Sequence, residues 1–74
     1  MFFSSFRSEK SVLTKRQVEV LRLLREGFST KEVAYEMYLS VHTVNNHLQN
    51  IYERLGASNR AQAQKRAKDL GLLD

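Results

Sequence analysis

The segment 40–55, SVHTVNNHLQNIYERL, constrains the fold more than any other part of the chain. Its apolar residues recur at spacings of three and four, the period of one helix face, and they are Val41, Val44, Leu48, Ile51 and Leu55. Such a stripe is buried against other helices, so the segment predicts a long amphipathic helix with one face in a core.

The opposite face of this helix has an unusual composition for a solvated surface. With about 100° of rotation per residue, it carries amides and an imidazole rather than mostly Lys and Glu. Its residues are His42, Asn46, Gln49, Asn50 and Glu53, with Thr43 and Asn45 on the flanks. These side chains can both donate and accept hydrogen bonds and are able to read base edges. Periodicity alone leaves an ordinary polar surface as the alternative.

The bulk properties leave room for one small domain. A length of 74 residues is near the lower limit at which a single core holds a fold without staples. The chain has no cysteine, so disulfides and thiolate metal sites are excluded and a reducing cytoplasm is suitable. The absence of proline and the presence of only three glycines favour an all-α domain.

Charge and hydropathy restrict the partners. The formal net charge of +4 suits an anionic partner, although many small proteins are basic. No apolar run approaches the roughly 20 residues of a membrane span, and the first ten residues lack the apolar core of a signal peptide. We therefore expect a cytoplasmic protein with no membrane partner.

Two capping boxes predict where the first two helices begin. In Thr14-Lys15-Arg16-Gln17 the threonine accepts from the third helical amide and the glutamine reaches back, and Ser29-Thr30-Lys31-Glu32 repeats the pattern. The first helix ends before Gly27, and the second covers about 30–38. The residues predicted to face inward are Val18, Val20, Leu21, Leu23 and Leu24 in the first helix and Val33, Ala34 and Met37 in the second.

A turn of a few residues, 38–40, separates the second helix from the third. Two helices joined so closely cross steeply, which is the geometry of a helix-turn-helix, here about residues 30–55. Ser40 caps the third helix and Gly56 ends it, after which Ser58 or Asn59 caps a fourth helix over about 60–70. The fourth helix is expected to bury a small-residue stripe of Ala63, Ala67 and Leu70.

Residues 1–12 precede these helices as a tail or linker, and residues 13–74 form the domain. The tail is rich in serine and charge but also contains Phe2, Phe3 and Phe6. It suits a mobile tail, a linker, or an arm that folds back. Three phenylalanines in a freely solvated tail are unusual, which favours docking on the core or on a partner subunit.

The residues that mark these helices resemble a known family. They are Leu13-Thr14-x-Arg16-x-x-Glu19-Val20-Leu21, Gly27, Lys31-Glu32-Val33-Ala34, Ser40-x-x-Thr43-Val44-x-x-His47-Leu48, Leu55-Gly56, Arg60-x-x-Ala63 and Gly71-Leu72. This set resembles the LuxR-type, or GerE-type, helix-turn-helix domain of bacterial transcription regulators, and it spans about residues 13–73. The resemblance implies a four-helix DNA-binding domain whose third helix, the recognition helix, enters the major groove.

The resemblance also implies partners. Family members act at paired half-sites near promoters, so double-stranded DNA and a second copy of the chain are expected partners, and RNA polymerase is a further candidate. No cofactor and no small-molecule ligand are expected in this domain. Such domains occur as output domains of response regulators and quorum sensors or as short free-standing regulators. The initial Met1 and the lack of a receiver domain favour the free-standing type, although an excised domain would look the same.

Positions matched to the family give the candidate base contacts. Asn45, Asn46 and Gln49 are the expected base readers, with His42 as a fourth. An Asn or Gln amide can bond adenine N6 and N7 together, whereas Arg or Lys prefers guanine. The family often has Lys or Arg at the position of Asn45, so we do not expect this chain to share its relatives' preferred sequence. A second departure, Gln17 where the family often has Glu, still serves the capping box.

Candidate phosphate contacts lie at the ends of the elements, where charges and amides gather. They are Thr30, Lys31, Thr43, Arg54 and Arg60, although isolated Lys and Arg are often simply solvated. The resemblance places a dimer contact on the fourth helix, and the residues expected to form it are Ala63, Ala67 and Leu70.

Metal and enzymatic sites are not expected. His42 and His47 are five residues apart and thus about 140° apart on the helix, unlike the i, i+4 pair that shares a metal. The chain has no Cys, no glycine-rich phosphate loop and no Ser-His-acid set that the predicted helices would gather, so we predict that it is not an enzyme.

Two functions compete with sequence-specific DNA binding. One is a protein-interaction module that uses the amide-rich face or the phenylalanine arm, which salt dependence would distinguish because DNA binding weakens steeply with salt. The other is nonspecific nucleoid or RNA binding, which is disfavoured because the reading face has no aromatic stacking platform. Tyr52 is expected nearer the core flank.

Overall fold

The computed structural model describes residues 12–73. This part of the chain contains four α-helices and no strands, and the helices are α2 (Lys15–Arg25), α3 (Thr30–Glu36), α4 (Val41–Leu55) and α5 (Arg60–Asp69). The predicted all-α class and helix-turn-helix are therefore confirmed, whereas the expected docking of the phenylalanine arm falls on residues outside the described range.

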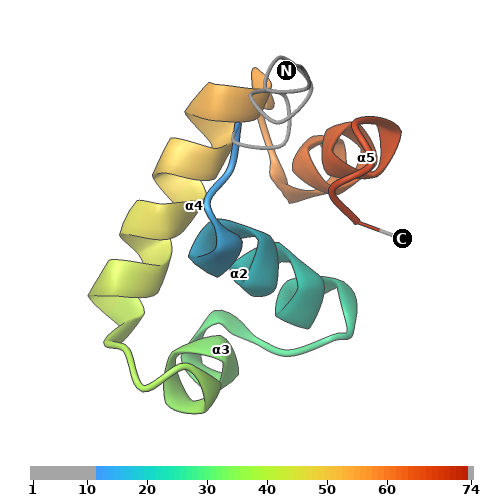
Figure 1. The fold of residues 1–74 in the computed structure, drawn as a ribbon. Coiled ribbons are helices and arrows are strands. Elements are labelled where there is room, and N and C mark those ends of the chain that lie inside the picture. Colours follow the sequence, from blue (N-terminus) through green and yellow to red (C-terminus); the bar gives the residue numbers. More distant parts are fainter. Residues whose placement is uncertain (1–11, 74) are drawn as a thin grey trace, which may run out of the picture.

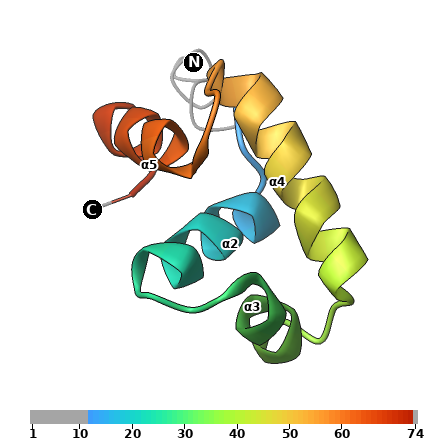
Figure 2. The same ribbon diagram turned by 180° about the vertical axis from the view of Figure 1, so that it is seen from behind.

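The longest helix, α4, is the element on which the others pack. Figure 1 shows α4 along one side of the molecule, with α3 beside its N-terminal end and α5 near its C-terminal end. The reverse view in Figure 2 agrees, and α2 lies between α3 and α5 in both. Helices α2, α3 and α5 each contact α4, and α2 also contacts α3. One face of α4 is thus covered along most of its length.

Side-chain caps begin all four helices, as the sequence predicts. Thr14 Oγ1 accepts from the Gln17 amide at 3.1 Å while Gln17 Oε1 accepts from the Thr14 amide at 2.9 Å. Ser29 and Glu32 make the equivalent pair of bonds at 3.1 and 2.8 Å. Ser40 caps α4, and Asn59 rather than Ser58 caps α5.

The four helices also end alike, although only three end with glycine. Gly27, Gly56 and Gly71 have positive φ after α2, α4 and α5, and Tyr38, at φ 58°, takes the same place after α3. In each case a second backbone amide reaches back across the turn, as when the Leu39 amide donates to the Ala34 carbonyl at 2.8 Å. The predicted end of α3 near residue 38 is therefore wrong by two residues, because Tyr38 already has the left-handed conformation that stops a helix.

The core consists of apolar residues from all four helices and the two flanking segments. The fully buried side chains among them include Val20, Leu21, Val33, Val44 and Ile51. Two residues predicted to be buried are exposed: Val41 retains 41% of its surface and Leu70 retains 53%. Val41 is the first residue of α4 and Leu70 is the cap after α5, so each lies at a helix end where its neighbours no longer cover it.

Two side-chain bonds to the backbone tie the helices together. The Arg16 guanidinium donates to the Met37 carbonyl at 3.3 Å, which joins α2 to the turn that precedes α4. The Gln64 amide donates to the Leu21 carbonyl at 2.9 Å, which joins α5 to α2. The bond from Arg16 therefore anchors the turn between α3 and α4 to α2.

Candidate nucleic-acid interface

The face of α4 opposite the core presents the amides that the sequence singles out. Asn45, Asn46 and Gln49 are exposed, as is His42 in the first turn. On the other side of the same helix, Val44, Leu48, Ile51 and Leu55 are buried. Burial of that stripe fixes the rotation of α4, so the amides face outward.

Three helices meet around a hollow beside this face. The hollow has a volume of about 510 Å³, and its lining residues are Thr30, Asn45, Leu48, Gln49, Tyr52 and Arg60. It therefore brings together two predicted base contacts from α4 and two predicted phosphate contacts, one from α3 and one from α5. The lining contains one cation and no carboxylate, which suits an anionic ligand.

Tyr52 is the lining residue that sequence reasoning missed. It was expected near the core flank, and its ring is indeed half-buried against the core. It also lines the hollow, because it follows Asn45 by seven residues and Gln49 by three and so lies on the same stripe of α4. The separations of three and seven residues therefore indicate, from the sequence alone, that Tyr52 lies on the same side of α4 as Asn45 and Gln49.

The other predicted phosphate contacts lie elsewhere. Thr43 is half-buried, and its amide donates to Ser40 Oγ at 3.1 Å, so this amide is already used by the cap. Arg54 is exposed and donates to the Val12 carbonyl at 3.2 Å. Arg54 lies about 180° around α4 from Asn45. Neither residue lines the hollow.

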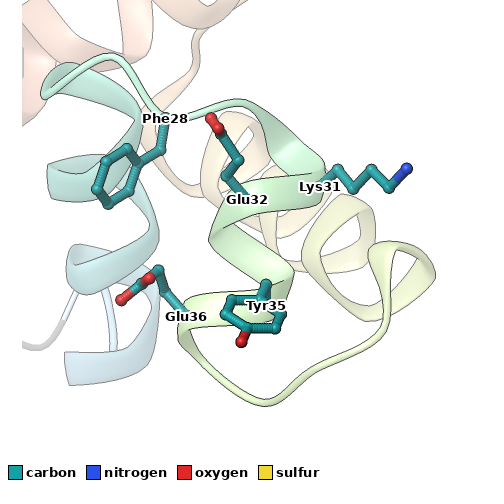
Figure 3. Close-up of a pocket in the computed structure, with 5 residues that line it drawn as sticks. All are labelled: Phe28, Lys31, Glu32, Tyr35 and Glu36. Atoms are coloured by element: carbon teal, nitrogen blue, oxygen red, sulfur yellow. The ribbon is translucent and has the colours of Figure 1, made fainter.

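Lys31 lines a separate depression, formed by α3 and by Phe28 just before it. Figure 3 shows its ammonium pointing away from the other residues of that depression, which are Phe28, Glu32, Tyr35 and Glu36. Glu32 is already engaged there, because its carboxylate accepts from the Ser29 amide at 2.8 Å. This depression shares no lining residue with the hollow beside the exposed amides of α4.

The predicted dimer contact needs correction. Ala63 and Ala67 have no exposed surface, because both pack in the core of the same protomer, and they cannot also touch a partner. Leu70 is exposed and lines a depression with Val12 and Leu55. Of the three residues expected at the contact, only Leu70 is accessible.

Two kinds of feature are absent from residues 12–73. No group of three or more His, Cys, Asp or Glu side chains in this range is placed to hold a metal ion. None of the helices is long and apolar enough to cross a membrane.

The helix pair α3–α4, joined by a short turn and with an exposed polar face on its second helix, defines a helix-turn-helix domain. Residues 11–67 match the GerE family, described as bacterial regulatory proteins of the luxR family. The chain therefore belongs to the luxR family, whose members are DNA-binding transcription regulators and not a class of enzymes.

Individual relatives agree with this assignment. The chain is 46% identical over 54 residues to the spore germination protein GerE of Bacillus subtilis, which covers 73% of each chain. It is 42% identical over 64 residues to the transcriptional regulatory protein DesR of the same organism, covering 86% of this chain but 32% of DesR. The solved structure of the transcription factor GerE superposes with a TM-score of 0.82 at 38% identity, covering 85% of this chain and 94% of that one.

Proposed function

We propose that this domain binds double-stranded DNA sequence-specifically by placing α4 in the major groove. The observation that carries the proposal is the row of exposed amides on α4 beside a carboxylate-free hollow that Arg60 lines. The amides supply hydrogen bonds for base edges, and the hollow supplies room and positive charge for the backbone. Asn45, Asn46 and Gln49 are the proposed base contacts, with His42 beside them in the first turn.

The proposed phosphate contacts fall into two groups. Thr30 and Arg60 share the hollow with the reading residues. Lys31, Arg54 and the Thr43 hydroxyl remain candidates at the margins. Binding as a dimer at paired half-sites is also part of the proposal, and such a contact would use Leu70, a large exposed hydrophobic residue that caps α5.

Site selection from random duplexes is the first experiment. We expect enrichment of paired half-sites about one helical turn apart, with adenine preferred at the positions that the amides contact. Enrichment of a single half-site would contradict the dimer but not the reading helix. No enrichment at all would contradict sequence-specific binding.

Gln49→Ala then tests base reading directly. We expect it to weaken binding to the selected duplex by about 1–3 kcal/mol while nearly preserving binding to a random duplex. Asn50→Ala is the matched control, since Asn50 is an exposed amide on the same helix that is not among the proposed base contacts. Equal losses on both duplexes, or equal effects of the two variants, would count against base reading by Gln49. Binding that does not weaken with salt would instead favour a protein partner.

A further inference from the structure

Three residues with hydrogen-bond donors, from three parts of the fold, line the same hollow. They are Thr30, Tyr52 and Arg60, which carry two hydroxyls and a guanidinium. None of these three side chains has a hydrogen-bond partner among residues 12–73. The donors are therefore free for a ligand that only accepts hydrogen bonds.

The position of Tyr52 along α4 suggests which ligand this is. A separation of seven residues places Tyr52 about 10 Å further along the helix axis than Asn45. The major groove is about 12 Å wide, so a helix that reads bases near Asn45 brings Tyr52 close to the groove wall. That wall is the sugar–phosphate backbone, whose phosphate oxygens accept hydrogen bonds and carry negative charge.

We propose that this hollow seats one backbone phosphate of the DNA and that the Tyr52 hydroxyl and the Arg60 guanidinium both donate to it. Thr30 lines the same hollow from α3, and its hydroxyl is the third donor of the proposed seat. The half-buried ring of Tyr52 packs against the core, which holds the hydroxyl in place with little loss of side-chain freedom on binding. The inference rests on the proposed function, because the phosphate reaches the hollow only when α4 lies in the groove.

Tyr52→Phe is the test, because it removes one oxygen and keeps the ring. We expect affinity to fall about tenfold, and by the same factor on the selected and the random duplex, since a phosphate carries no base identity. The slope of log affinity against log salt should not change, because the hydroxyl is neutral. Arg60→Gln should flatten that slope by about one. Tyr35→Phe is the matched control, since Tyr35 is 81% exposed and lies outside the hollow.

The double variant decides whether the two residues share one phosphate. Tyr52→Phe combined with Arg60→Gln should lose less affinity than the product of the two single losses, because each single change already weakens the same contact. If the affinity loss of the double variant equals the product of the two single losses, the two residues do not share one phosphate. The proposal is also overturned if Tyr52→Phe binds with unaltered affinity, or if its loss is confined to the selected duplex. A lowered melting temperature of Tyr52→Phe would overturn it as well, because the hydroxyl would then have a structural role. Failure of the unaltered protein to bind either duplex would remove the proposed function itself.

Discussion

Replacing Ser40 with alanine removes the N-cap of α4 and leaves the core untouched. Ser40 is exposed, its Oγ accepts from the Thr43 amide at 3.1 Å, and its hydroxyl donates to Thr43 Oγ1 at 3.0 Å. Loss of such a cap costs about 1 kcal/mol of unfolding free energy. In a domain of this size 1 kcal/mol corresponds to about 4–8 °C, so Ser40→Ala should melt lower by that amount.

DNA affinity should fall as well, although the variant stays mostly folded at 25 °C. The residue at the third helical position of α4 is Thr43, so Ser40 has no Glu or Gln to complete a capping box, unlike the caps of α2 and α3. Without Ser40 the first turn of α4, which carries His42, frays before the rest of the domain unfolds.

Thermal unfolding followed by circular dichroism measures the first effect. Ser40→Asn is the control, because its side-chain oxygen can accept the same amide and should keep the melting temperature close to that of the unaltered protein. The reasoning is refuted if Ser40→Ala melts at the unaltered temperature. It is also refuted if Ser40→Asn melts as low as Ser40→Ala.

Two further predictions concern α5 and the margins of the interface. Ala67→Leu should lower the unfolding free energy by about 1–3 kcal/mol, measured by urea denaturation, because Ala67 is fully buried and leaves no room for a larger side chain. Leu70→Lys should change stability by less than about 0.5 kcal/mol but weaken self-association in sedimentation experiments, and unaltered association would exclude Leu70 from the dimer contact. If Lys31 and Arg54 contact phosphates, Lys31→Ala and Arg54→Ala should each flatten the slope of log DNA affinity against log salt by about one. An unchanged slope would mean that the residue contacts only solvent or, for Arg54, only the Val12 carbonyl.

Helix beginnings could be predicted from the sequence because a cap is a local interaction. Thr14, Ser29, Ser40 and Asn59 each bond an amide three residues further along the chain, so a short stretch of sequence contains the whole motif. The end of α3 could not be predicted in the same way. Tyr38 adopts the left-handed conformation without being glycine, at a cost of about 1–2 kcal/mol that the surrounding structure must offset.

The sequence predicts which side of each helix is buried, but not how much of each side chain is covered. Periodicity identifies which side of a helix faces the core, yet it does not say how far the neighbouring helices reach. Val41 and Leu70 have the right spacing but lie beyond that reach. Ala63 and Ala67 are the opposite case, because they are packed so closely within the protomer that no surface remains for a partner.

The exposed amide face of α4 could be predicted from the sequence, whereas the hollow could not. The amides lie within one helix, so their common face follows from the helical repeat alone. The hollow needs the relative positions of α3, α4 and α5, which depend on tertiary packing. The place of Tyr52 on α4 predicts a position near the core flank, which is confirmed, but it does not predict that Arg60 at the start of α5 lines a hollow with it.

The three exposed amides of α4 that are proposed base contacts carry no charge, which would have a kinetic consequence for the proposed DNA complex. Steering of a protein toward DNA depends on long-range attraction between charges, whereas neutral amides act only after contact. Asn45, Asn46 and Gln49 would then leave the encounter rate almost unchanged and instead set how long the complex lasts on a matching sequence. Arg60 and the other cations at the margins would instead set the association rate. One set of side chains would thus control how fast the domain reaches DNA, and another set would control which sequence it stays on.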